Sequence, residues 1–222
     1  MNIFDKLAAA SIPLVPRFIV RRLSTRYIAG EKMEKALVTG KNLLDAGYQV
    51  TYDILGEAVE QEAGVRSAAA EYIDLIEALV SQGLELNISL KPTQMGLNLS
   101  EDFCFDVVSG IASVARDHGA FIRFEMEDSP TTEATLQVFH RLREEFGGTI
   151  GCVLQSMLFR SVDDARHLVS IGQPLNVRLV KGIYVEPKEV AWQGFSEVNA
   201  SYLETLRVLL EGGAFVGLAT HD

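Results

Sequence analysis

The chain has 222 residues, of which 48% are hydrophobic and 23% are charged. This composition supports a substantial buried core and excludes a disordered or fibrous protein. The formal net charge of −10 is unlike the basic surface that nucleic-acid binding requires. The two cysteines, Cys104 and Cys152, stand in apolar stretches, so we expect buried thiols in a reducing compartment rather than a disulfide.

The first 30 residues are basic, although the chain as a whole is acidic. They contain five Lys or Arg residues and one Asp, which gives them a net charge of +4 and leaves −14 for the rest. Their apolar stretch is interrupted by Pro13, Pro16 and Arg17 and is too short to cross a bilayer. The sequence favours an exposed helix here, and peripheral contact with an anionic membrane surface is the alternative. We therefore expect a cytoplasmic protein, either free or in contact with the inner face of the cell membrane.

Amphipathic helices alternate with short apolar strands along the rest of the chain. The spacing of apolar residues predicts helices over residues 31–46, 66–82, 100–117, 131–145, 161–170 and 196–210. Each of these ranges is followed by a Gly, the residue that most easily adopts the left-handed conformation at a helix end. Strands are predicted over residues 48–55, 86–90, 120–124, 150–154 and 215–219, and in the run 177–184.

The repeated strand and helix pattern predicts an α/β fold of the (β/α)8 TIM-barrel type. Successive strand ends lie about 25 to 40 positions apart, the size of one strand–helix unit. We expect a distorted barrel with about six of the eight units in this chain. Residues 1–47 are predicted to form an N-terminal helical arm and residues 48–222 an incomplete barrel catalytic domain. A doubly wound open sheet is the alternative fold, although the chain lacks the glycine-rich nucleotide motifs of that class.

Polar residues follow the apolar strands at their C-terminal ends, where barrel enzymes build their sites. Such residues follow the strands at Lys91, Glu125, Gln155 and Thr220. The run 177–184 is the most informative. Its alternation predicts Arg178 and Tyr184 on one side and Val177, Leu179 and Ile183 on the other, and Gly182 permits close approach of the backbone to a ligand.

Taken together and in order, these fragments resemble the FAD-dependent proline dehydrogenases of the short monofunctional bacterial type. Residues 26–31 resemble the entry helix of that family, and the strand-end fragments are 53–57, 89–93, 124–129, 155–158, 178–184 and 219–222. The resemblance implies a distorted barrel that binds FAD noncovalently and oxidises L-proline to Δ1-pyrroline-5-carboxylate. It also implies that the electrons pass to a membrane quinone.

The resemblance also implies a role for individual residues. Glu125 and Arg178 are expected to be catalytic, with Arg178 beside the flavin ring, and Lys91 and Tyr184 are expected to bind the substrate. The expected cofactor contacts are Met126, Gln155, Arg178, Lys181, Gly182, Ile183, Thr220 and His221. No metal site is expected, because His118, His140 and His167 fall on or beside helices and form no metal-binding pattern.

The chain departs from the family pattern at three points. Glu125 stands where the family generally has Asp, and Ile183 stands where it usually has Ala. The family's last helix supplies an Arg pair and a Tyr that hold the substrate, and no residue after Asp222 can take those parts. We therefore expect little or no proline oxidation by the 222-residue chain alone, because a bidentate Arg contact is not replaced by Lys91.

Two other functions stay open from the sequence. One is a class I aldolase or related lyase, in which Lys181 or Lys91 forms a Schiff base and Glu125 transfers protons. The other is a noncatalytic binding module, or an inactive flavin-binding fragment.

Overall fold

The computed structural model describes residues 29–30 and 32–220. The chain divides between Gln49 and Val50 into two compact units. The first unit contains helix α3 (Met33–Asp45), which buries Leu37. The expected entry helix at residues 26–31 falls almost wholly outside the described residues.

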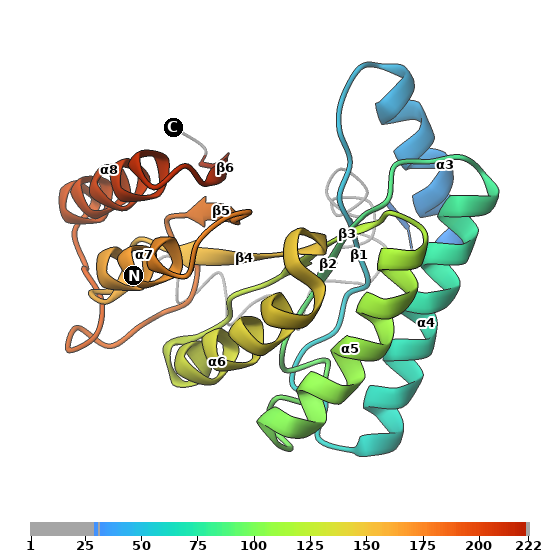
Figure 1. Ribbon diagram of the computed structural model, residues 1–222, viewed down its shortest axis with the longest axis horizontal. Helices are drawn as coiled ribbons and strands as arrows, with labels where there is room; N and C mark the ends of the chain where they lie inside the picture. Colours follow the sequence, from blue (N-terminus) through green and yellow to red (C-terminus); the bar gives the residue numbers. More distant parts are fainter. Residues whose placement is uncertain (1–28, 31, 221–222) are drawn as a thin grey trace, which may run out of the picture. The chain divides into compact units, whose positions relative to one another are not determined.

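The second unit contains a six-stranded sheet and the helices that connect its strands (Figure 1). The strands are β1 (Tyr52–Asp53), β2 (Asn87–Leu90), β3 (Phe121–Phe124), β4 (Ile150–Gln155), β5 (Asn176–Val180) and β6 (Phe215–Ala219). The helices are α4 (Glu62–Ser81), α5 (Glu101–Asp117), α6 (Ser129–Phe146), the 3-10 turn η2 (Gly147–Thr149), α7 (Ser161–Ser170) and α8 (Phe195–Glu211). In Figure 1, α4, α5 and α6 lie side by side, and α7 lies beside α8.

The strands follow one another across the sheet in the order in which they occur in the chain. Every neighbouring pair is parallel, from β1 to β6. A doubly wound sheet reverses its strand order at a switch point, so that alternative is wrong. The predicted barrel-type α/β fold is confirmed, with six strands and the five α-helices that connect them in the described part of the chain. In the described part of the chain the barrel is not closed, and β1 and β6 are the two edges of the sheet.

The two faces of the sheet differ in chemistry. One face is apolar and, from β2 to β5, buried, as expected for parallel strands covered by helices. Its residues include Ile88, Leu90, Ile122, Phe124, Cys152, Val177 and Leu179, none of them accessible to solvent. The opposite face, called the inner face below, carries polar residues in register. Asp53 lies next to Ser89, Ser89 next to Arg123, and Arg123 next to Gly151.

Two predicted strands end earlier in the structure than in the sequence pattern. β1 covers only two of the eight residues predicted. It ends at Asp53, and the next N–H, that of Ile54, donates to the Tyr72 hydroxyl (3.1 Å) instead of continuing the ladder. β5 ends at Val180, and the predicted alternation does not continue past it. Gly182 has φ +114°, a conformation that glycine adopts without strain. Ile183 therefore does not share the buried side of Val177 and Leu179, and it is 88% exposed.

Gly151 makes room on the inner face for the guanidinium of Arg123. A Cβ at position 151 would lie 2.5 Å from the Asn176 carbonyl oxygen and 2.8 Å from Arg123 Nη1. The side chain of Phe121 would also be too close, at 2.7 Å. The backbone oxygen cannot move without disturbing β5, so only glycine fits at this position.

We expect Gly151→Ala to destabilise the fold by about 1–3 kcal/mol, because overpacking displaces neighbouring strands. Urea denaturation of the purified protein measures this effect. Gly110→Ala in α5 is the matched control, since an added Cβ there meets no neighbouring atom, and it should stabilise by up to about 1 kcal/mol. Equal stability of the Gly151→Ala protein and the wild type would contradict the steric account of the inner face.

Candidate active site

A pocket of about 580 Å³ lies at the C-terminal ends of the strands. Its walls come from the strands β4, β5 and β6 and from the segments that follow β2, β3, β5 and β6. The lining residues are Lys91, Glu125, Met126, Glu127, Val153, Gln155, Arg178, Val180, Lys181, Gly182, Ile183, Tyr184, Ala219 and Thr220. The structure therefore brings together every predicted site residue in the described part of the chain. His221 lies outside the described residues.

Arg178 and Glu125 form an ion pair inside this pocket. The Arg178 Nη1 atom donates to Glu125 Oε1, and the Ser89 hydroxyl donates to the same oxygen. Both charged side chains are mostly buried, so the pair is screened less by water than a surface pair. The Glu125 carboxylate, which follows β3, thus reaches a guanidinium on β5, two strands away.

Arg123 is a second buried cation, on the inner face of the sheet, and it was not among the residues predicted from the sequence. Its guanidinium donates to the Cys152 and Asn176 carbonyls (3.0 and 3.1 Å) and to Asn176 Oδ1 (2.6 Å). Burial, and then the charge of Arg178, lower its pKa to about 10. The signal was present in the sequence, because Arg123 stands between the apolar residues Ile122 and Phe124 at an inward-facing position of β3.

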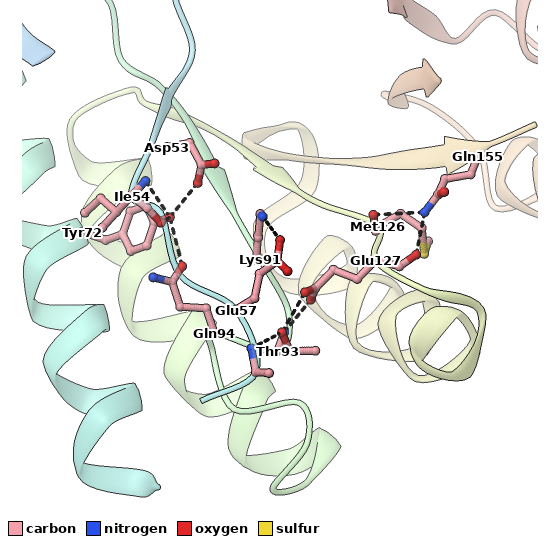
Figure 2. A network of polar contacts seen from close by, with 11 residues as sticks. Asp53, Ile54, Glu57, Tyr72, Lys91, Thr93, Gln94, Met126, Glu127 and Gln155 are labelled. Carbon is pink, nitrogen blue, oxygen red and sulfur yellow. Dashed lines mark hydrogen bonds and ion pairs between the residues drawn. The ribbon is translucent and has the colours of Figure 1, made fainter. Parts of the chain in front are cut away.

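In the side-chain amide of Gln155, the last residue of β4, the nitrogen has hydrogen-bond partners but the oxygen has none among the described residues. Its amide nitrogen donates to the Met126 carbonyl (3.2 Å) and the Glu127 carbonyl (2.5 Å), as Figure 2 shows. Its Oε1 atom is buried and has no hydrogen-bond partner among the described residues. A buried acceptor without a donor is costly, so this oxygen is suited to a ligand N–H in the pocket.

A polar network surrounds the segment between β1 and α4 (Figure 2). Lys91 forms an ion pair with Glu57. The Tyr72 hydroxyl lies 3.2 Å from Asp53 Oδ1 and 3.4 Å from Gln94 Oε1. Partial burial raises the pKa of the Asp53 carboxyl, although the hydrogen bond from Tyr72 acts in the opposite direction. The sequence predicted Lys91 at this site but not its partner or the role of Tyr72.

Thr93 connects that segment to Glu127. The Ala58 N–H donates to the Thr93 hydroxyl oxygen (2.8 Å), and the same hydroxyl donates to Glu127 Oε1 (2.7 Å). The Thr93 backbone N–H donates to the other oxygen of Glu127 (2.8 Å). Burial raises the pKa of Glu127 despite these hydrogen bonds. Glu127 is therefore held as part of the wall rather than exposed to solvent.

The segment after β5 forms the opposite wall. The Lys181 ammonium lies 4.6 Å from the centroid of the Phe195 ring, a cation–π contact. Gly182 packs against Met157, whose sulfur would lie 2.3 Å from a Cβ at that position. Burial, and then the carboxylates of Glu57 and Glu127, raise the pKa of Tyr184 to about 12. The Tyr184 phenol is thus neutral at physiological pH.

The remaining thiols and histidines do not form a metal site in the described part of the chain. Within residues 29–30 and 32–220, no three His, Cys, Asp or Glu side chains lie close enough to hold a metal ion. Cys104 and Cys152 are free and buried, and burial raises the pKa of each thiol to about 12. His140 and His167 form an edge-to-face pair between α6 and α7, with ring centroids 5.0 Å apart.

None of the helices in the described residues is long and apolar enough to cross a bilayer. The basic stretch at residues 1–30, which carries the sequence-based expectation of membrane contact, falls almost entirely outside them.

A family model and the curated relatives of this chain point to the same protein family. The family model for proline dehydrogenase matches residues 36–222. The proline dehydrogenase of Deinococcus radiodurans is 34% identical over 204 residues, which cover 90% of this chain and 65% of that protein. Proline dehydrogenase 1 of Bacillus subtilis is 33% identical over 197 residues, which cover 89% of this chain and 64% of that protein. This chain thus spans about 65% of the length of these curated relatives.

Solved structures of proline utilization A (PutA) share the fold. PutA from Bdellovibrio bacteriovorus, inactivated by N-propargylglycine, matches with a TM-score of 0.83 at 24% identity over 90% of this chain and 25% of that one. PutA from Corynebacterium freiburgense matches with a TM-score of 0.78 at 20% identity over 100% of this chain and 26% of that one. The predicted resemblance is confirmed, and these findings do not support the Schiff-base lyase.

The histidine pair predicts a loss of stability in acid. Burial, and then the charges of His167 and Arg143, lower the pKa of His140 from 6.5 in the folded chain. Above about pH 6.5, His140 is neutral in both the folded and the unfolded chain and does not reduce the free energy of unfolding. As the pH falls from there toward the pKa of His140 in the folded chain, the free energy of unfolding decreases, because the unfolded chain binds the proton more readily.

We expect His140→Leu to reduce the fall in melting temperature between pH 7 and pH 5. His118→Gln, at the exposed end of α5, is the matched control and should leave the wild-type fall in place. Thermal denaturation across this pH range measures both. If the melting temperature of the His140→Leu protein falls between pH 7 and pH 5 as much as that of the wild type, groups other than His140 control the stability in acid.

Proposed function

Because this chain belongs to the proline dehydrogenase family, we propose that the pocket at the ends of β2 to β6 is the FAD and substrate site of an enzyme that oxidises L-proline to Δ1-pyrroline-5-carboxylate. The observation that carries the proposal is the clustering of all the predicted site residues in the described part of the chain around one pocket. We assign residues 48–222 as the catalytic domain and residues 1–47 as a helical arm. The division of the chain at Gln49 supports this assignment.

The chemistry of the pocket walls fits a flavin. The orphaned Gln155 Oε1 is suited to accept a hydrogen bond from a ring N–H. Val153, Val180 and Met126 supply apolar surface for a flat ring. Gly182, Ile183 and Thr220 complete the predicted contacts, and His221 would add another from beyond the described residues.

The cations and the carboxylate of the pocket have different proposed roles. Arg178 and Lys181 present positive charge to an electron-rich ring, and Glu125 keeps the Arg178 guanidinium in one orientation. When bound, FAD supplies a two-electron acceptor for the hydrogen removed from the carbon next to the proline nitrogen. In this proposal, the Arg178 charge would stabilise the negative charge that accumulates on the reduced ring.

Lys91 and Tyr184 are the proposed substrate residues. The Lys91 ammonium, at the pocket edge, is held by Glu57 and can attract the proline carboxylate. The Tyr184 side chain packs on the cluster of Met157, Leu158 and Ala191 and so has a fixed position. Its neutral phenol closes one side of the pocket against water.

A quinone is the proposed electron acceptor, and the cytoplasm, with peripheral contact at the inner face of the cell membrane, is the proposed location. Both rest on the family resemblance and on the net charge of +4 in residues 1–30.

The absorption spectrum of the purified protein tests the proposed function. We expect an oxidised-flavin band after incubation with FAD, and only slow or partial bleaching when L-proline is added without oxygen, in line with the low proline oxidation expected of this chain from its sequence. A preparation that takes up no FAD would contradict the proposal, and rapid, full bleaching would contradict the expected low activity.

We expect Gln155→Met to weaken FAD binding by about 10-fold or more, because the buried hydrogen bond to the ligand is lost. Titration of the apoprotein with FAD, followed by flavin fluorescence, measures the affinity. Gln137→Met is the control, since Gln137 is exposed on α6 and bonds only locally to Glu133. Equal affinities of the Gln155→Met and wild-type proteins would place the flavin elsewhere.

A further inference from the structure

Glu186 is a buried carboxylate in a loop that is mostly exposed. The loop, residues 181–194, joins β5 to α8 and begins with the pocket residues 181–184. Val185 is 91% exposed, whereas Glu186 is only 9% exposed. Burying a carboxylate is costly unless it accepts hydrogen bonds, so the partners of Glu186 indicate what it does.

Both oxygens of Glu186 bind the first residue of α6. The Ser129 backbone N–H donates to Oε1 (2.7 Å), and the Ser129 hydroxyl donates to Oε2. The N-cap residue Asp128 makes no side-chain capping bond, so the carboxylate from a distant loop supplies a partner for a free N–H at this helix end. Negative charge is also favourable at a helix N-terminus. The contact is therefore a charge-assisted pair of hydrogen bonds over 57 positions of sequence.

The two ends of the loop are attached to a different element, the segment after β4. The Met157 N–H donates to the Lys181 carbonyl (2.9 Å) at the start of the loop. Near its end, the Trp192 N–H donates to the Met157 carbonyl (2.8 Å), and the Phe159 N–H donates to the Val190 carbonyl (2.9 Å). Glu186 differs from these anchors because it connects the middle of the loop to α6.

The segment that leads into α6 belongs to the opposite wall of the pocket. Met126 and Glu127 line the pocket and stand three and two residues before Ser129, respectively. Ile183 and Tyr184 line the other side and stand three and two residues before Glu186, respectively. The bond between Glu186 and Ser129 thus joins the two walls directly behind the residues that face the ligand.

We infer that Glu186 is a positioning residue that fixes the distance between these two walls and holds the loop over the bound cofactor. The inference rests on the proposed function for the identity of the ligand, but not for the contact itself. Glu186 touches neither substrate nor cofactor. It acts through Ser129 on one side and through Tyr184 on the other.

Hydrogen exchange of the purified chain tests the contact without any ligand. We expect Glu186→Ala to increase exchange at Ser129, whose backbone N–H loses its acceptor, and at Phe159 and Trp192, whose N–H groups anchor the end of the loop, while β4 and β5 keep their protection. Glu189→Ala is the matched control, because Glu189 is an exposed carboxylate of the same loop. Unchanged exchange in the Glu186→Ala protein would overturn the inference.

Titration with FAD tests the consequence for the pocket. If the loop spends a tenth of its time in the binding position, the apparent Kd for FAD rises about tenfold. We expect this rise for Glu186→Ala, a smaller rise for Glu186→Gln, which can keep one accepted bond, and none for Glu189→Ala. Failure of the wild-type chain to bind FAD would count against the proposed function, and the exchange experiment would still decide the role of Glu186.

A double-mutant cycle shows whether Glu186 and Ser129 act together. Ser129→Ala removes the hydroxyl donor but keeps the backbone N–H, so its effect on the Kd should be smaller than that of Glu186→Ala. The double variant should bind FAD no more weakly than Glu186→Ala alone, because the contact is already lost. Additive losses would overturn the inference. If Glu186→Ala does not fold, the Ser129→Ala and Glu186→Gln proteins give the same comparison.

Discussion

The ion pair between Arg178 and Glu125 is the interaction on which the pocket depends. It places two opposite charges in a partly buried space, with β4 between the strands that carry them. Removing one partner from such a pair leaves an unpaired buried charge, at a cost of about 3–5 kcal/mol. Ser89 donates to the same carboxylate oxygen and so fixes it from a second direction. The charged wall is therefore ordered before any ligand binds.

The topology of the sheet makes this pair possible. Six parallel strands in sequential order bring all their C-terminal ends to one rim, so residues from distant parts of the sequence meet there. The helix-covered face supplies the apolar core, and the inner face is free to carry polar groups. Gly151 and Arg123 show the limit of this arrangement, because a buried guanidinium fits only where the neighbouring strand has no side chain.

Local pattern in the sequence was sufficient for the elements and for the residues at the strand ends. A helix end at a glycine, or an apolar strand that ends near Lys91, Glu125 or Arg178, depends only on residues close by in the chain. The spacing of apolar residues along the sequence is therefore enough to predict such features. The contacts that depend on distant partners could not be predicted this way. The Glu186 bond to Ser129 and the Tyr72 bond to Ile54, which ends β1, join residues with no shared local pattern. Ile183 was assigned to the wrong side because the backbone leaves the strand before Gly182.

A crystal structure of the chain with bound FAD is the most direct test of the central claim, that the strand ends form one flavin pocket around this ion pair. The account predicts the ring between Gln155 and Arg178, with Gln155 Oε1 accepting a hydrogen bond from it and Arg178 still paired with Glu125. A flavin bound away from these residues, or an Arg178 guanidinium turned out of the pocket, would contradict it.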